Sequence, residues 1–225
     1  MTLRPAFYLY QNRGNTVVTG PASEPITADD LWAHLRTDEN DLPDALDYVT
    51  AARSHIEATT NVAIVTQTAR LTIDHWPNGS EAWWDGVQQL PASELYNASA
   101  MRSVVLPRWP LASIVSVTVY DEDGNSVVVN IGNTFDVDIA SNPGRLTLKR
   151  GATWPIAMRA NNAIEIVYTA GYGVDPCEVP FMYRQAVKQM AAYMYEHRGD
   201  NCSSGDAFHM SGAASILNVY KAARI

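Results

Sequence analysis

The sequence predicts an α+β fold: a helical bundle, with two N-terminal and two C-terminal helices, that carries an inserted antiparallel β-rich region. Two stretches of helical periodicity open the chain, several short alternating stretches follow, and two further helical stretches close it. Helices and strands segregated in this way are typical of α+β proteins and not of a doubly wound sheet. At 225 residues the chain is long enough to bury a substantial core.

The chain is expected to divide into an N-terminal arm, residues 1–25, and one domain, residues 26–225. The arm has no clean hydrophobic period and is interrupted by glycine and proline, so we expect it to be irregular or to dock on a partner. Within the domain, helices are predicted at residues 27–36, 42–60, 180–198 and 213–223, and the β-rich insertion at residues 62–170.

The first two helices have recognisable ends. Thr27 and Asp30 form a start similar to a capping box for the first helix. The second helix is predicted to be capped by Asp41, to carry Pro43 in its first turn and to end near Asn61, which tolerates the left-handed conformation. Its buried stripe is predicted to consist of Leu42, Leu46, Val49, Ala52 or Arg53, and Ile56.

Short strands separated by turn residues are predicted in the insertion. The acidic stretch 121–125 is typical of a hairpin turn, and Asn142-Pro143-Gly144 of a second turn. Residues 77–100 have no dominant period and are predicted to be a long irregular excursion. The strands themselves are expected within residues 62–76, 101–106, 114–120, 126–131, 135–139, 145–148 and 163–170.

The third helix follows Pro180 and has a single apolar stripe, made of Tyr183, Ala186, Val187, Met190, Ala191 and Met194. Residues 199–212 are small and polar, which predicts a mobile loop. The last helix, at residues 213–223, is expected to direct Ile216, Leu217 and Tyr220 inward.

The net charge of −8, with no run of Lys or Arg, argues against a protein that binds nucleic acid through its phosphates.

The two cysteines, Cys177 and Cys202, are expected to be reduced thiols. No apolar run reaches the ~18 residues that span a membrane, and the first residues lack the order of a signal peptide. We therefore expect a soluble protein made inside the cell, with no membrane partner.

No motif for catalysis, a cofactor or a metal stands out. Gly171-Tyr172-Gly173 lacks the third glycine of a dinucleotide loop, and the acidic stretch 121–124 lacks the ligand spacing of a calcium loop. Cys177, His197, Cys202 and His209 match no zinc spacing, so free thiols and separate histidines are expected. The prediction is a protein that is not an enzyme and has no catalytic, cofactor-binding or metal-binding residues.

Trp83 and Trp84 lie side by side in the irregular excursion. Paired aromatic residues in a loop are typical of a protein-contact surface. A loop that folds back on its own domain explains them equally well, and both readings stay open.

Many weak motifs occur in a fixed order along the chain: residues 26–36 with the acidic link after them, 45–60 leading into 63–67, Leu106-Pro107, Pro110-Leu111, 114–119, 121–124, 142–145, Trp154-Pro155, 168–173 and 180–198. Together they resemble the head-to-tail connector family of long-tailed bacteriophages and gene transfer agents. The resemblance covers residues 26–225, while the arm and the tryptophan-rich excursion depart from it.

The resemblance implies a structural virion protein: a head-to-tail adaptor that forms a ring, of twelve copies, under the portal. Such a ring extends the DNA channel without binding DNA specifically and docks stopper or tail proteins. It implies a location at the head-tail interface of a particle made in the host bacterial cytoplasm. The C-terminal region is the implied portal contact, with Ile216, Leu217, Tyr220 and Arg224 as candidates, and the exposed face of helix 41–61 and the β-rich part are candidates for the ring contact. The alternatives are a generic intracellular α+β protein-binding domain and a phage-encoded hydrolase.

Overall fold

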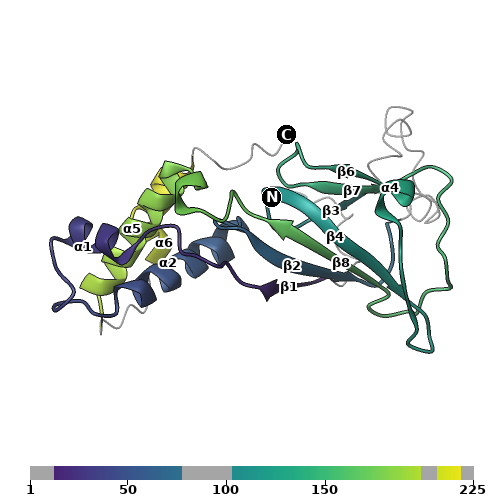
Figure 1. The fold of residues 1–225 in the computed structure, drawn as a ribbon, viewed down its shortest axis with the longest axis horizontal. Coiled ribbons are helices and arrows are strands. Elements are labelled where there is room, and N and C mark those ends of the chain that lie inside the picture. The colour runs from purple at the N-terminus through teal and green to yellow at the C-terminus, as the bar shows by residue number, and fades with distance from the viewer. Residues whose placement is uncertain (1–12, 78–102, 199–206, 219–225) are drawn as a thin grey trace, which may run out of the picture. The chain divides into compact units, whose positions relative to one another are not determined.

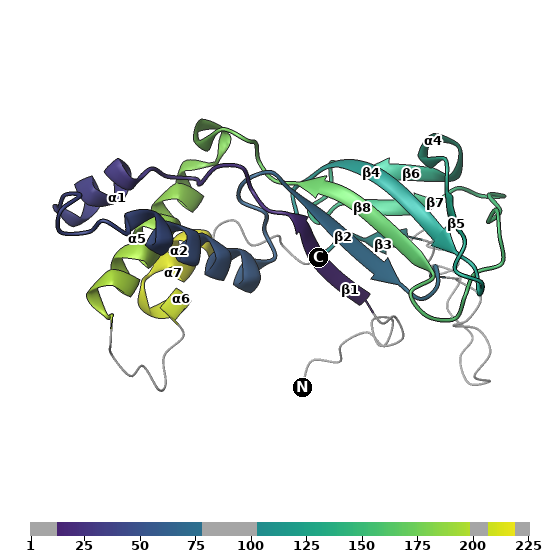
Figure 2. The same cartoon turned by 60° about the horizontal axis from the view of Figure 1, so that its bottom comes forward.

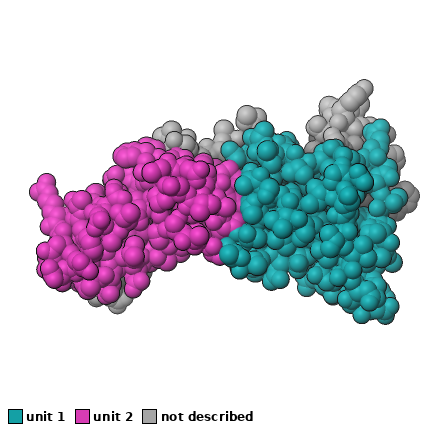
Figure 3. Space-filling view, viewed as in Figure 1, with its two compact units in different colours: residues 1–19, 68–107, 111–169 teal, residues 20–67, 108–110, 170–225 magenta. Residues whose placement is uncertain are grey.

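The computed structural model describes residues 13–77, 103–198 and 207–218. They form helices together with antiparallel sheets, which confirms the α+β class predicted from the sequence. Trp83, Trp84, Cys202, Tyr220 and Arg224 lie outside the described residues. Two compact units are present: a β-rich unit, residues 1–19, 68–107 and 111–169, and a helical unit, residues 20–67, 108–110 and 170–225 (Figure 3).

The β-rich unit holds two sheets, which lie against each other as layers in Figures 1 and 2. Helix α4, Ile131–Thr134, leads into the smaller sheet. The larger sheet has the order β1-β2-β8-β4-β5, with β1 Arg13–Thr19, β2 Gln67–Ile73, β8 Ile164–Ala170, β4 Leu111–Tyr120 and β5 Ser126–Val128. The smaller sheet has the order β3-β7-β6, with β3 Ser103–Val105, β7 Arg145–Leu148 and β6 Phe135–Asp138.

Alternation along the strands explains the core of this unit. On β8, Ile164, Ile166 and Tyr168 are buried and the residues between them are half-buried, as a period of two requires. Strand β2 repeats the pattern. Three aromatic rings join the two sheets: the Trp76 centroid lies 5.1 Å from Phe135 of β6 and 5.7 Å from Trp154. We name Trp76, Phe135 and Trp154 the aromatic cluster.

Strand β1 corrects the prediction that residues 1–25 are irregular. It pairs antiparallel with β2, from Arg13 opposite Ile73 to Thr19 opposite Thr68. Four consecutive residues, 16–19, are Thr-Val-Val-Thr, whose branched Cβ atoms favour extended backbone. No alternation of apolar and polar residues marks this strand, because most of its side chains are exposed and period analysis depends on burial.

The helical unit is built on α2, Ala45–Thr60, and α5, Phe181–Glu196, which pack against each other. Helix α1, Ala28–Leu35, and helix α7, Ala213–Leu217, pack on α5. A 3₁₀ turn, η4, Pro176–Glu178, precedes α5, and α6, Ala207–Met210, precedes α7. The predicted stripe of the third helix is largely buried: Tyr183, Ala186, Val187, Met190 and Ala191 lie in the core, and Met194 packs against it.

The expected features at the ends of the first two helices are present. The Oγ1 atom of Thr27 accepts a hydrogen bond from the Asp30 backbone N–H, and the Asp30 carboxylate accepts one from the Thr27 N–H, both at 3.2 Å. This is a full capping box. Asn61, after α2, has φ 59° and is the left-handed residue that ends the helix.

Other predictions for the helices were wrong. Helix α2 begins at Ala45, because the Asp38 carboxylate accepts bonds from the backbone of Asn40 and Asp41 and holds that stretch in a turn. Leu46 is 51% exposed, since the buried stripe runs through Ala45, Val49, Ala52 and Ile56 and Leu46 lies about 100° away from Ala45 around the helix. Residues 207–210, predicted as loop, form α6 because Phe208 is buried in the core.

Candidate functional site

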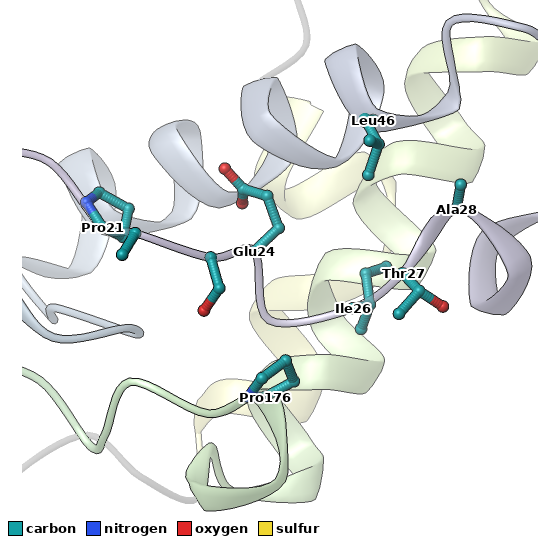
Figure 4. A pocket seen from close by; sticks show the side chains of 9 residues that line it. Pro21, Glu24, Ile26, Thr27, Ala28, Leu46 and Pro176 are labelled. Atoms are coloured by element: carbon teal, nitrogen blue, oxygen red, sulfur yellow. The ribbon is translucent and has the colours of Figure 1, made fainter.

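The candidate site is an open groove of about 440 Å³ on the helical unit. Figure 4 shows it between the extended segment that leads into α1, the first turn of α2 and the 3₁₀ turn η4. We name it the Leu46 groove. It is lined by Pro21, Ala22, Ser23, Glu24, Ile26, Thr27, Ala28, Leu46 and Pro176.

A partly buried ion pair fixes the wall of the groove. Arg53 of α2 donates from Nε to Glu24 Oε2 at 2.7 Å and from Nη2 to Glu24 Oε1 at 3.1 Å. This is the bidentate geometry that guanidinium and carboxylate groups favour. Thr50 Oγ1 donates a third bond to the same carboxylate, at 3.1 Å. The segment that holds Glu24 is therefore held against α2 at one register.

The ion pair continues inward to Glu57, which is 4% exposed. Its Oε2 accepts from Arg53 Nη1 at 2.9 Å, and its Oε1 accepts from the Ile64 backbone at 2.8 Å and from Gln67 Nε2 at 3.0 Å. Burial by itself lowers the pKa of Arg53, but the hydrogen bond to Glu24 and the charges of Glu57 and Glu24 outweigh it and raise that pKa. Glu24, Arg53 and Glu57 are referred to below as the carboxylate–arginine network.

At its other end the groove is fixed by the α1 cap. Lys188 Nζ of α5 donates to Asp30 Oδ1 at 2.9 Å. This bond, opposed by burial and assisted by the Thr27 backbone N–H, lowers the pKa of the Asp30 carboxyl. Asp30 stays ionised while it caps α1, and Thr27 keeps its place in the lining.

The groove suits apolar contact better than chemistry. Ile26 is buried in its floor and half of Leu46 is exposed at its edge. The one titratable side chain in the lining is Glu24, whose carboxylate is engaged by Arg53 and Thr50. A carboxylate held this way is a poor acid or base, whereas exposed apolar side chains on a rigid rim suit a protein partner.

Residues 13–77, 103–198 and 207–218 contain no group of three His, Cys, Asp or Glu side chains placed to hold a metal ion. Within the same ranges, no helix has the length and apolar character needed to cross a bilayer.

The structure places only some of the residues singled out from the sequence. Ile216 is half-buried against the core of the helical unit, while Leu217 is 3% exposed and belongs to that core. Leu217 thus packs within its own chain in this structure. The predicted contacts at Tyr220, Arg224, Trp83 and Trp84 fall outside the described residues.

Sequence reasoning missed the groove. Its wall depends on the pairing of Glu24 with Arg53, which are 29 positions apart. The available signals were Pro21 and Pro25, which favour an extended segment.

No family model matches the chain, and no curated protein matches it. Solved structures do. A chain in the neck of an empty gene transfer agent (GTA) particle, computed with C6 symmetry, superposes with a TM-score of 0.67 at 23% identity, over 94% of this chain and 97% of that one. The fold is that of a GTA neck chain.

Two further structures give the same result. A chain in the virion of a native GTA particle superposes with a TM-score of 0.66 at 24% identity, over 94% of this chain and 96% of that one. A chain in the neck of a native GTA particle, computed with C12 symmetry, gives a TM-score of 0.59 at 24% identity, over 92% and 97% of the two chains. The resemblance inferred from the sequence is confirmed at the level of the fold.

Proposed function

We propose that this chain is a structural protein of the neck of a phage-like particle: a head-to-tail adaptor that forms a ring under the portal, extends the DNA channel and docks stopper or tail proteins. One observation carries the proposal, namely that the structural match runs end to end on both chains, covering 94% of this one and 97% of the neck chain. A shared generic domain would leave part of one chain unmatched.

The symmetries of the similar particles support a ring. One neck was computed with C6 symmetry and another with C12 symmetry. Twelve copies satisfy both symmetries, and this is the copy number that we propose. A closed ring requires that two different faces of each subunit meet.

Surface charge supports passage of DNA without adhesion. From the start of α1 to the first turn of α2, the one Lys or Arg is Arg36, whereas six carboxylates are exposed: Asp29, Asp38, Glu39, Asp41, Asp44 and Asp47. Together with the net charge of −8, this surface repels the phosphate backbone.

The Leu46 groove is assigned to the contact between neighbouring copies in the ring. Leu46 lies on the exposed side of α2, which is the face that the family resemblance implies for ring closure. Leu46→Lys should therefore reduce incorporation of the protein into particles while its thermal unfolding stays unchanged, since the side chain is half exposed. Leu42→Lys, at a buried site of the same unit, is the contrasting variant and should unfold the protein.

The portal contact is assigned to the C-terminal end of the chain, at Ile216, Tyr220 and Arg224, with Leu217 as the anchor that holds α7 on its own domain. A truncation must start after Asn218, because Ala213, Ala214 and Leu217 are buried. Removal of residues 219–225 should abolish attachment to portals and leave the fold intact. Normal decoration of portals by the truncated protein would remove this assignment.

The proposed function is tested by deletion of the gene in the producing cell, followed by electron microscopy of the particles. The expected result is DNA-filled heads without tails, restored by a plasmid copy and not by a copy lacking residues 219–225. Normal tailed particles in the deletion strain would overturn the proposal and favour a generic binding domain instead. A hydrolase would be indicated if tails formed but particles failed to deliver DNA.

A further inference from the structure

The outer edge of β1 is the feature that the proposed function leaves unused. Strand β1 is the end strand of the larger sheet and pairs with β2 on one side (Figure 2). Among the described residues, no strand pairs with its other side. An edge of this kind presents a row of backbone N–H and C=O groups that can accept one more strand.

This edge lacks most of the devices with which proteins protect exposed edges. From Gly14 to Thr19 it has neither a charged residue nor a proline. Val17 and Val18 are 42% and 54% exposed. The register shift falls between Val17 and Thr19, so the pairing from Arg13 to Val17 stays regular.

The opposite edge of the same sheet is different. Strand β5, Ser126–Val128, has three residues and follows the acidic turn Asp121-Glu122-Asp123. A short strand beside a charged turn is a poor template for a further strand. Of the two edges of this sheet, β1 is the one suited to pairing.

The chain itself contains a segment of the right chemistry. Residues 6–10 read Ala-Phe-Tyr-Leu-Tyr, with three aromatic residues and no charge, a composition enriched in strands. Only Gln11 and Asn12 connect this segment to β1. Two-residue hairpin turns favour Asn-Gly, Asp-Gly or a leading glycine, because their central residues take positive φ. Gln11-Asn12 does not match these turn sequences, and the nearest glycine, Gly14 of β1, is already paired with Thr72 of β2.

We propose that the outer edge of β1 takes up residues 6–10 of a second copy of the chain as an added strand. Backbone hydrogen bonds would supply the affinity, and the exposed Val17 and Val18 would pack against the incoming aromatic side chains. The exchange joins two different surfaces of the chain, as a ring interface requires. It does not depend on the neck role, because it concerns any assembly of two or more copies.

The test is a photo-crosslinking experiment on mixed copies of the full-length chain. Unlabelled protein carries benzoyl-phenylalanine in place of Tyr8, and it is mixed at high concentration with nitrogen-15-labelled protein of natural sequence. After irradiation, mass spectrometry shows whether the segment around position 8 is joined to residues 14–19 and whether that partner peptide is labelled. The expected product joins an unlabelled N-terminal peptide to a labelled β1 peptide.

Two variants of the labelled copy sharpen the result. Val18→Lys places a charge on the β1 edge and should reduce the cross-link to background. Val128→Lys, a 69% exposed valine on the opposite edge, should leave it unchanged. Both substitutions are at exposed sites, and thermal unfolding checks that each variant is folded. Cross-links confined to a single chain, equal loss in both variants, or no cross-link to β1 would each overturn the proposal.

Discussion

Each of the two units of this chain is stabilised internally by a different kind of contact. In the β-rich unit three aromatic rings join the sheets, with centroids 5.1 to 6.0 Å apart. In the helical unit a carboxylate–arginine network joins an extended segment to α2, with Arg53 7% exposed at its centre. Apolar burial is non-directional and tolerates small shifts, whereas a bidentate ion pair fixes one register. In the helical unit, the directional hydrogen bonds of the ion pair thus fix the groove wall. In the β-rich unit, the burial of apolar surface holds the two sheets against each other.

The largest effect is expected in the aromatic cluster. Trp76 is 5% exposed and contacts both other rings, so Trp76→Ala should lower the free energy of unfolding by about 4 kcal/mol. Urea unfolding measures the loss, and hydrogen exchange should locate it in β2, β6 and β7. Val128→Ala, at an exposed site of the same unit, should change stability by less than about 0.5 kcal/mol. A loss below about 1 kcal/mol for the tryptophan variant would show that the layers do not depend on the cluster.

The next largest effect is expected at Arg53. Arg53→Ala removes the hydrogen-bonded guanidinium from the buried Glu57 carboxylate and leaves Arg108, whose Nη1 lies 3.9 Å from Oε2, as its remaining cationic neighbour. The substitution should cost about 3 kcal/mol, at the low end for breaking a buried ion pair. Amide exchange should rise in residues 20–27, because Glu24 loses its bidentate partner. Arg53→Lys should recover only part of the loss, since an ammonium group cannot form the fork. Arg150→Ala, at an exposed arginine, is the matched control. Unchanged exchange in residues 20–27 would show that the network does not hold the groove wall.

A smaller effect is expected at the start of α1. Thr27→Ala removes one half of the capping box and should cost about 1 kcal/mol. Thr59→Ala, near the end of α2, removes only a bond from Oγ1 to the His55 carbonyl and should be close to neutral. The two variants are compared by thermal unfolding. Equal losses would mean that the capping box contributes nothing specific.

The smallest effect depends on pH and belongs to the β-rich unit. Hydrogen bonds from Ser141 and then from Arg145 lower the pKa of Asp138 to about 2. The unfolded carboxyl titrates near its ordinary value of about 3.9. Because the folded pKa is the lower one, the stabilisation is present above about pH 4 and is lost as the pH falls towards 2. Asp138→Asn should therefore be less stable than the natural protein at pH 5, and the difference should shrink at pH 2.5. A constant difference would contradict this assignment.

Local signals in the sequence were sufficient for much of the fold. The capping box at Thr27, the left-handed end of α2 at Asn61 and the alternation in β8 each depend on residues a few positions apart. Because the interactions that produce these features are local, they can be predicted directly from the sequence.

Long-range contacts decided what the sequence did not reveal. Strand β1 is extended because β2 pairs with it, and the Leu46 groove exists because Glu24 meets Arg53. Helix α6 forms because Phe208 is buried in the core of the helical unit. The residues that make these contacts lie far apart in the sequence, so their contacts become apparent only in the folded chain.

The most direct test of the neck role is a cryo-electron microscopy reconstruction of the neck in intact particles from the producing cell. We expect a closed ring between portal and tail, with twelve copies whose density fits both units of this chain and whose C-terminal residues contact the portal. A neck fully accounted for by other proteins, with this chain absent from the particle, would contradict it.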